Sequence, residues 1–190
     1  YEGPAESVRI IAGQFRGLAL ASVGKGDAGA HLRPTSDRVR ESLFNILTKY
    51  DVFEGARVLD LFAGTGALGL EALSRGAAQV CFVDDGAKAG QLIRQNIALT
   101  GSGAQTRLIR RDARKLPANE DAPYDLVFLD PPYGKDLGAR ALDAARAGGW
   151  IGDDAMIVWE DSTPQPAPDG FSLLDQRKYG ATHITILQAD

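Results

Sequence analysis

A run of four residues has the chemistry to hold an amine. Asp130-Pro131-Pro132-Tyr133 follows directly on the apolar run 126–129, which predicts a buried strand that ends at a carboxylate. Each proline lacks an N–H and has a fixed φ, so the loop is stiff and its carbonyls are free to accept hydrogen bonds. Acceptors beside an aromatic ring suit an aromatic amine that stacks on Tyr133. We expect Asp130, Pro131, Pro132 and Tyr133 to form the catalytic centre; the alternative is a rigid turn capped by Asp130.

A glycine loop predicts a cofactor site. The run 60–69 joins the apolar run 56–61 to a helical pattern and contains Gly64-x-Gly66-x-x-Gly69. Glycines at such a turn let a ligand approach the backbone, which serves dinucleotides, flavins and S-adenosylmethionine alike, and a tight turn that binds nothing is the alternative. Asp60 would repel a pyrophosphate but attract a sulfonium and an ammonium, so S-adenosylmethionine is the favoured cofactor. The expected contacts in this loop are Asp60, Phe62, Ala63, Gly64, Thr65 and Gly66.

Acidic residues after the next two predicted strands extend the cofactor site. Asp84 lies where an acidic side chain binds ribose hydroxyls, and Asp85 beside it is able to share that role. Helix capping is the alternative for Asp84. Asp112 is expected to accept from the adenine amino group, with Ala113 as the neighbouring backbone contact.

The elements that must position these residues alternate between strand and helix patterns. Strands are predicted at 56–61, 79–84, 106–110, 125–129 and 155–159, and helices around 70–73 and at 86–99 and 137–147. This alternation predicts an α/β fold with a parallel sheet. Two further runs, 171–178 and 182–188, are too close for a crossover, so an antiparallel hairpin is expected at the sheet edge. Ligands bind at the carboxyl ends of such strands, where the first and fourth should lie side by side.

The first fifty residues are predicted to form a small N-terminal extension, and residues 51–190 the cofactor-binding domain. Residues 8–20 indicate a hairpin or two short strands, 24–30 a loop, and 36–50 an amphipathic helix with Thr35 as its N-cap. Residues 1–7 show no periodicity and are expected to lie outside the folded part.

Composition limits the class of protein. With 190 residues, of which 44% are hydrophobic, the chain fits one globular domain with a small appendage. It has no apolar run of about 18 residues and no signal pattern, so a cytoplasmic protein without a membrane span is expected. The single Cys81 excludes an internal disulfide, and His31 and His183 lack partners at metal spacing, so no metal is expected.

The net charge of −4 argues against nucleic-acid binding, but the charge is unevenly distributed. Residues 8–40 carry six Lys and Arg against two Asp. Because phosphate contacts come from Lys and Arg, we expect RNA contacts from Arg33, Arg38 and Arg40. For any one of them, an ion pair on a solvated helix face is an equally good alternative.

The glycine loop and Asp-Pro-Pro-Tyr together resemble the class I S-adenosylmethionine-dependent amino-methyltransferases, which act on exocyclic amines of nucleic-acid bases. More narrowly, Arg9-Ile-Ile-Ala-Gly13 with Arg16-Gly17, and the run Leu-Arg-Pro-Thr-Ser-Asp-Arg-Val-Arg-Glu-Ser-Leu-Phe-Asn at 32–45, resemble the RsmD family over nearly all of residues 8–188.

The resemblance implies a Rossmann-like fold with a mostly parallel seven-stranded sheet. It also implies methyl transfer to N2 of a guanine in 16S ribosomal RNA, within the small subunit or an assembly intermediate. By position, the family's cofactor loop falls on 60–66, its ribose carboxylate on Asp84, its adenine contact on Asp112 and its amine motif on 130–133. Asp84 stands where a longer Glu is frequent, so the ribose contact is either direct or through water.

Other functions fit parts of the pattern. A DNA adenine or cytosine amino-methyltransferase would share the pocket, but no sizeable separate target-recognition domain remains once the sheet is assigned. A non-catalytic RNA-binding module with this fold would not need both an intact Asp130 and an intact glycine loop. A dinucleotide oxidoreductase is disfavoured by Asp60 and leaves the proline pair unexplained.

Overall fold

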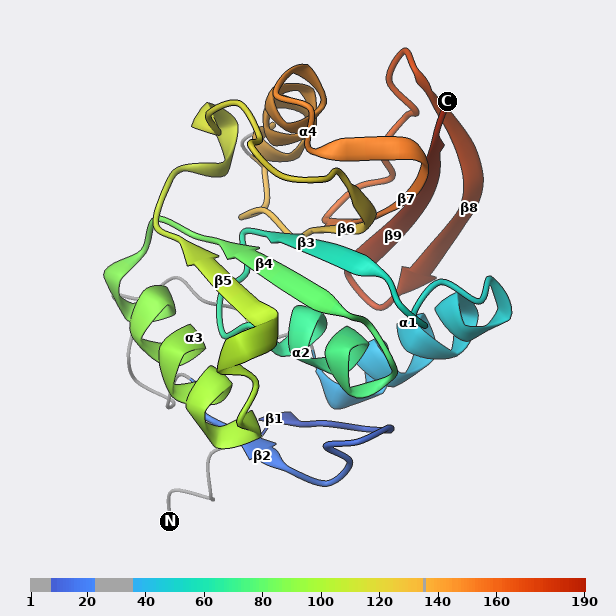
Figure 1. Ribbon diagram of the computed structural model, residues 1–190. Coiled ribbons are helices and arrows are strands. Elements are labelled where there is room, and N and C mark those ends of the chain that lie inside the picture. The colour runs from blue at the N-terminus through green and yellow to red at the C-terminus, as the bar shows by residue number, and fades with distance from the viewer. Residues whose placement is uncertain (1–7, 23–35, 135) are drawn as a thin grey trace.

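A seven-stranded sheet forms the centre of the protein (Figure 1). The structure is a computed structural model that describes residues 8–22, 36–134 and 136–190. The strand order is β5-β4-β3-β6-β7-β9-β8. The strands β3 (Arg57–Leu61), β4 (Gln79–Val83), β5 (Thr106–Ile109), β6 (Tyr124–Leu129) and β7 (Ile151–Asp161) run parallel. β9 (Thr182–Ala189) pairs antiparallel with β7 on one side and with β8 (Phe171–Tyr179) on the other. The predicted Rossmann-like α/β fold with a C-terminal edge hairpin is confirmed.

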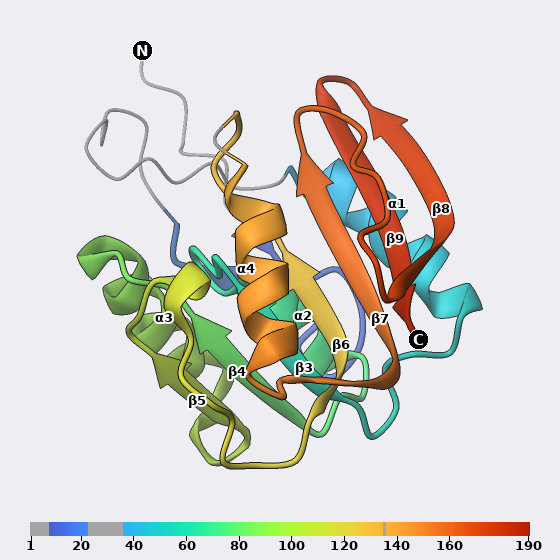
Figure 2. The ribbon, with the colours of Figure 1, turned by 90° about the horizontal axis from the view of Figure 1, so that it is seen from above.

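Helices cover both faces of this sheet (Figures 1 and 2). On one face, α1 (Asp37–Lys49), α2 (Ala67–Ser74) and α3 (Ala87–Thr100) pack on an apolar cluster that includes Phe44, Phe82 and Phe128. On the other face, α4 (Leu137–Ala147) and the short 3-10 helix η2 (Ala113–Lys115) pack on a cluster that includes Trp150 and Trp159. A second 3-10 helix, η1 (Gly103–Gln105), leads into β5. Burial on both faces explains why the central strands are almost continuously apolar.

Several boundaries differ from those expected from local patterns, and two of these differences have a physical reason in the structure. α1 begins at Asp37 with Ser36 as its N-cap, because the Ser36 side chain accepts from the Val39 N–H at 3.2 Å. Thr35, the predicted cap, lies outside the described residues. β7 begins at Ile151, four positions before the predicted start. Its first residues include Gly152, Asp153 and Asp154, which do not form an apolar run, and a register shift in the pairing with β6 accommodates them.

The N-terminal residues share a core with the sheet. β1 (Val8–Arg9) and β2 (Ala19–Leu20) pair antiparallel, which confirms the predicted hairpin. Val8 and Leu20 belong to the same apolar cluster as the sheet residues beneath α1. At Gly13 the backbone has φ +88°, and an added Cβ would collide with the carbonyl of Ser74. A glycine is therefore required where this segment lies against the end of α2.

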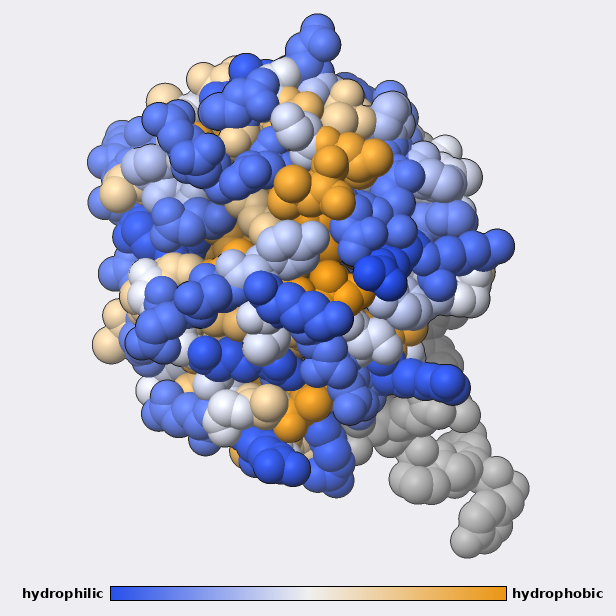
Figure 3. All heavy atoms as spheres, turned by 90° about the vertical axis from the view of Figure 1, so that its right-hand side faces the viewer, coloured by the Kyte–Doolittle hydropathy of each residue, from blue (hydrophilic) through white to orange (hydrophobic). Residues whose placement is uncertain are grey.

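The edge strand β8 exposes apolar side chains. Leu173 and Leu174 are 49% and 38% exposed, and the pairing with β9 shifts register after Leu173. Figure 3 shows this side of the molecule, on which apolar areas lie among hydrophilic side chains. A bulge in an edge strand disfavours pairing with a further strand. Within the described parts of the chain, no helix combines the length and the apolar composition needed to cross a bilayer.

Candidate active site at the carboxyl edge of the sheet

The carboxyl ends of five parallel strands bring the predicted site residues, and one acidic residue that was not predicted, to one edge of the sheet. In spatial order they are Asp112 after β5, Asp84 after β4, the glycine loop after β3, Asp130 after β6, and Glu160 near the end of β7. β3 and β6 are neighbours, and the Asp130 N–H lies 3.4 Å from the carbonyl of Leu61. The chain leaves β3 toward β4 and β5 and returns as β6 on the other side, so the glycine loop and Asp130 meet where strand order switches, as expected.

Positive φ angles shape the loop that follows β3. Phe62, Gly64 and Gly66 have φ of 56°, 61° and 82°. Only glycine adopts this region without strain, so Phe62 is held there by its surroundings. The Ala63 N–H donates to the carbonyl of Val83 at 3.1 Å, which ties the loop to the end of β4. The loop thus has half-buried residues at 62–64 and few large side chains where it leads into α2.

Asp60 lies beneath this loop, inside β3. Its side chain is 1% exposed, and Oδ2 accepts from the Gly69 N–H at 3.1 Å. Burial raises the pKa of Asp60 well above its usual value, the bond from Gly69 opposes that shift, and the charge of Asp84 adds to it. Asp60 therefore fixes the first turn of α2 through the bond from the Gly69 N–H.

Asp84 connects the glycine loop to the turn that leads into α3. Its Oδ2 accepts from the Gly64 N–H at 3.0 Å and its Oδ1 from the Gly86 N–H at 2.8 Å. Burial raises the pKa of Asp84, while these two bonds lower it. Gly86 is the N-cap of α3 and no side chain caps that helix, so the structure does not show the alternative capping role. Each carboxylate oxygen keeps a lone pair, and Asp85 is exposed beside them.

Asp112 is already paired in this structure. Its carboxylate accepts from the Arg114 N–H at 2.9 Å and forms an ion pair with Arg114 Nη2 at 2.7 Å, and this pairing lowers the pKa of Asp112. An adenine amino group would have to share the carboxylate with Arg114. Ala113 is buried in the first turn of η2. The adenine role of both residues stays a prediction.

The amine motif lies at the end of β6, where Pro131 is buried and Pro132 is exposed. The Tyr133 hydroxyl donates to Glu160 Oε1 at 3.4 Å and lies 3.2 Å from Thr182 Oγ1. Asp130 forms a side-chain hydrogen bond with Glu160, and burial, followed by the charge of Glu160, raises the pKa of Asp130 well above its usual value. One side of the site is therefore a pair of neighbouring carboxyl groups behind an anchored aromatic ring.

Glu160 was not among the residues predicted from sequence, because the predicted strand ended at residue 159. It is 6% exposed at the carboxyl end of β7. A usable signal was present: Glu160 follows a buried apolar run, as Asp130 follows the run 126–129 in the parallel neighbour.

The predicted RNA-binding arginines differ in their positions. Arg38 is exposed at the start of α1, and Arg33 lies outside the described residues. Arg40 is fully buried, and the prediction for it is wrong: its guanidinium pairs with Asp37 at 2.8 Å and with the buried Glu71 at 3.6 Å. Helical spacing places Arg40 on the apolar stripe of α1, three and seven residues before Leu43 and Leu47, and this was a sequence signal for burial.

Two further buried polar residues connect the N-terminal segment to the site. Glu71 accepts from the N–H groups of Ile11 and Ala12, at 2.8 and 3.2 Å. Asn96 accepts from the Ala21 N–H at 2.7 Å and donates to the carbonyl of Thr65 at 2.8 Å. Because Thr65 belongs to the glycine loop, the N-terminal segment supports this loop through Asn96.

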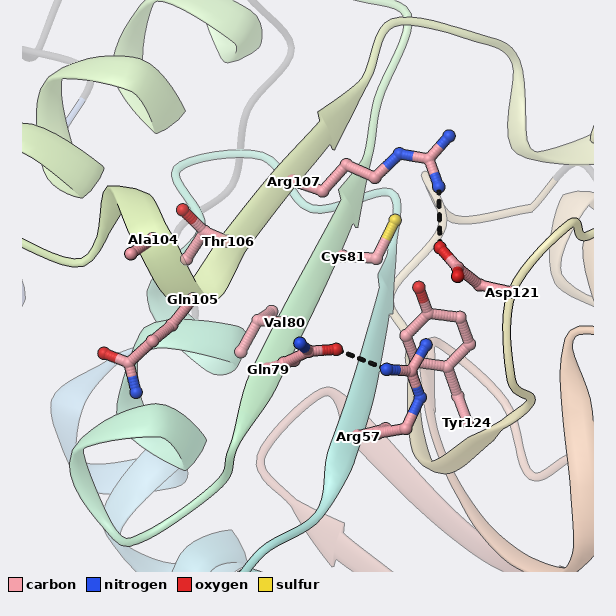
Figure 4. A pocket seen from close by; sticks show the side chains of 10 residues that line it. All are labelled: Arg57, Gln79, Val80, Cys81, Ala104, Gln105, Thr106, Arg107, Asp121 and Tyr124. Atoms are coloured by element: carbon pink, nitrogen blue, oxygen red, sulfur yellow. Dashed lines mark hydrogen bonds and ion pairs between the residues drawn. The ribbon is translucent and has the colours of Figure 1, made fainter.

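A hollow lies at the opposite, amino-terminal edge of the strands (Figure 4). Its volume is about 170 Å³, and Arg57, Arg107, Tyr124 and Cys81 contribute to its lining. Both arginines have partners there: Arg57 donates a hydrogen bond to Gln79, and Arg107 forms an ion pair with Asp121 at 3.7 Å. Burial raises the pKa of the Cys81 thiol to about 11, so Cys81 is a buried, protonated thiol at neutral pH.

Known proteins resemble this chain over nearly its whole length. Residues 8–188 match the family described as conserved hypothetical protein 95. Ribosomal RNA small subunit methyltransferase D of Escherichia coli is 38% identical over 161 residues, which are 85% of this chain and 78% of that protein. Putative rRNA methyltransferase YlbH of Bacillus subtilis is 36% identical over 185 residues, which are 94% of this chain and 97% of that protein.

Solved structures agree with these sequence matches. The putative methyltransferase yhhF from Escherichia coli superposes with a TM-score of 0.83 at 36% identity and covers 97% of this chain and 98% of its own. The putative methylase HI0767 from Haemophilus influenzae has a TM-score of 0.77 at 30% identity and covers 96% and 98%. The chain therefore belongs to the family of conserved hypothetical protein 95, the RsmD family of methyltransferases that its motifs resemble.

Proposed function

We propose that this protein transfers a methyl group from S-adenosylmethionine to the exocyclic N2 amine of a guanine in 16S ribosomal RNA. The observation that carries the proposal is the pairing of β3 with β6, which sets the glycine loop beside Asp130 of the amine motif. The relatives named as methyltransferases of ribosomal RNA support the substrate class. We place the reaction in the cytoplasm, on the small subunit or an assembly intermediate.

The charges around the glycine loop fit S-adenosylmethionine better than a dinucleotide. Asp60, Asp84 and Asp85 surround the loop, and the run 60–69 contains no Lys or Arg. Such a site would repel a pyrophosphate and attract a sulfonium and an ammonium. Asp84 would bind the ribose hydroxyls with the lone pairs that its two backbone bonds leave free. Bound there, S-adenosylmethionine supplies an electrophilic methyl group, whose bond to sulfur breaks as the amine nitrogen attacks.

Asp130 and the Pro131 carbonyl would hold the attacking amine. Both accept hydrogen bonds, so they would turn the two amine hydrogens toward the protein and direct the nitrogen lone pair away from the base ring toward the methyl carbon. Positioning is the main catalytic device in such a displacement. When the C–N bond has formed, the nitrogen loses one proton, which Asp130 or a water accepts. Tyr133 would stack on the base that has been turned out of its helix.

Arg38 is the described arginine that we propose for a phosphate contact. It is exposed in the first turn of α1, in the segment of the chain with excess positive charge. Arg33 stays a proposal of the same kind. Phosphate contacts of this kind position an RNA without reading its sequence.

Incubation with labelled S-adenosylmethionine and 16S ribosomal RNA, bare or in small subunits, tests the proposed reaction. The label should appear as N2-methylguanosine at one mapped nucleotide. Label on an adenine, on DNA only, or on none of these substrates would contradict the proposal.

Asp130→Asn tests the proposed role of the amine motif. Transfer should fall by about 100-fold or more, because Asn keeps the size of the side chain but loses the charge and the proton acceptor. Binding of S-adenosylmethionine by calorimetry should change little. Asp143→Asn on the exposed face of α4 is the matched control and should keep full activity. Loss of cofactor binding by a folded Asp130→Asn variant would place Asp130 in the cofactor pocket instead.

A further inference from the structure

Asp130 and Glu160 occupy equivalent positions on neighbouring parallel strands. Leu129 of β6 lies opposite Trp159 of β7. The residues that follow them, Asp130 and Glu160, therefore lie at the same level of the sheet. Side chains alternate along a strand, and Phe128 and Val158, two residues earlier, both belong to the cluster beneath α1 and α2. Asp130 and Glu160 therefore project to the same face, the one on which Asp60 supports the glycine loop.

Two contacts of the Glu160 side chain are with the amine motif. Its carboxyl group bonds to the side chain of Asp130 and accepts from the Tyr133 hydroxyl at 3.4 Å. The same hydroxyl lies 3.2 Å from Thr182 Oγ1 at the start of β9. A base stacked on Tyr133 with its amine at Asp130 would consequently turn the ring atom next to that amine toward Glu160.

That neighbouring ring atom distinguishes guanine from the other bases that carry an exocyclic amine. In guanine the N2 amine lies between N3, which is an acceptor, and N1–H, which is a hydrogen-bond donor and is the flanking atom that a carboxylate beside the amine would bind. In adenine the N6 amine is flanked by N1, and in cytosine the N4 amine is flanked by N3, and both of these ring nitrogens are acceptors. A second acceptor beside the amine site would thus accept a hydrogen bond from N1–H of guanine, whereas it would repel the lone pair on N1 of adenine or on N3 of cytosine.

We infer that Glu160 determines the base specificity of the reaction by accepting the N1–H of the target guanine, while Asp130 and the Pro131 carbonyl accept the N2 amine. This inference rests on the proposed function and assigns it a residue that reads the substrate. Glu160 is more than nine-tenths buried, so an acceptor lone pair forced against its carboxylate would find little water to screen it. A site built to bond an N–H discriminates strongly against an analogue that lacks it.

The test compares guanine with 2-aminopurine at the mapped target nucleotide of ribosomal RNA. 2-Aminopurine keeps the 2-amino group but has an acceptor at N1. A synthetic segment that carries either base is ligated into the RNA, which is used bare or assembled as the mapping experiment requires. The wild-type protein should methylate guanine at least about tenfold faster than 2-aminopurine.

Glu160→Gln is the informative variant, because its amide keeps the shape of the side chain and has an N–H to donate to N1 of 2-aminopurine. The ratio of kcat/KM for guanine to that for 2-aminopurine should fall by at least about tenfold. Tyr133→Phe is the control: it removes the hydroxyl that joins Glu160 and Thr182 but leaves the carboxyl pair in place. It should slow both substrates alike and leave the ratio near that of the wild-type protein.

The outcomes separate this inference from the proposed function. If wild-type protein methylates no guanine N2, the proposed function fails and the inference fails with it. If wild-type protein methylates guanine N2 but Glu160→Gln keeps the wild-type ratio, or if Tyr133→Phe lowers the ratio as much, Glu160 only anchors Tyr133 and the inference alone is wrong. If Glu160→Gln does not fold, the wild-type comparison decides, and a preference for guanine below about twofold overturns the inference.

Discussion

Glu71→Gln perturbs a buried carboxylate that holds three parts of the chain together. Glu71 Oε1 accepts from the Ile11 N–H and faces Arg40 Nε at 3.6 Å. Its Oε2 accepts from the Ala12 N–H and pairs with Arg75 Nε at 3.1 Å. A glutamine side chain has only one oxygen. In either orientation, its NH₂ group therefore faces a backbone N–H that donated a hydrogen bond to the carboxylate, and that bond is lost.

The expected loss follows from the burial of this network. Arg40 and Glu71 are both fully buried, and without Glu71 the remaining acidic partner of Arg40 is Asp37, whose side chain is 46% exposed. Removing one partner of a buried ion pair lowers the free energy of unfolding by about 3–5 kcal/mol. We take this range to include most of the cost of leaving the N–H of Ile11 or Ala12 without an acceptor. Such a loss is a large share of the free energy of unfolding of a typical protein domain, which is about 5–15 kcal/mol. For a chain of this size it lowers Tm by about 6–20 °C.

Urea and thermal unfolding measure this effect against an exposed pair. Asp175 pairs with Arg177 at 3.0 Å, with the arginine side chain 52% exposed. Asp175→Asn also removes a carboxylate from an arginine, but water replaces that partner, so the expected cost is below about 1 kcal/mol. The difference between the two variants isolates the effect of burial.

A Glu71→Gln variant within about 1 kcal/mol of wild type would refute the argument that this charge network stabilises the fold. Two arginines extend the test to function. Arg40→Met should lower stability, whereas Arg38→Ala should leave stability unchanged, weaken RNA binding and reduce its salt dependence. The reverse pattern would restore the sequence-based view of Arg40 as an RNA contact.

Gly69→Ala should lower stability by about 1–3 kcal/mol, because its Cβ would lie 2.6 Å from the Phe82 ring and 2.7 Å from Val80; Gly103→Ala, where nothing lies within 4 Å, is the control in thermal unfolding. S-Adenosylmethionine should bind more tightly as pH rises, because burial raises the pKa values of Asp60 and Asp84 and a bound cation favours their charged forms. Calorimetry checks the sign, and S-adenosylhomocysteine, which has no sulfonium charge, should show a weaker dependence. Affinity for S-adenosylmethionine that falls with rising pH would contradict the assignment.

Much of the fold followed from local patterns. α4 spans the predicted 137–147, α3 ends one residue after the predicted 99 with Gly101 as its C-cap at φ 62°, and Asp130 directly follows β6. These features depend on apolar periodicity and on the backbone limits of glycine and proline, which act over a few residues. The glycine loop and the amine motif could also be identified from the sequence, because each consists of a few consecutive residues at the end of an apolar run.

The sequence by itself thus determined which elements form and which loops carry the glycines and the prolines of the site. Only the tertiary structure decided which charged groups meet. Arg38 and Arg40 are two residues apart on one helix, yet one is exposed and the other pairs with Glu71, 31 positions farther along the chain. Glu160 meets Asp130 because β7 pairs with β6 in a particular register. Such contacts depend on long-range packing, which leaves only weak traces in local patterns.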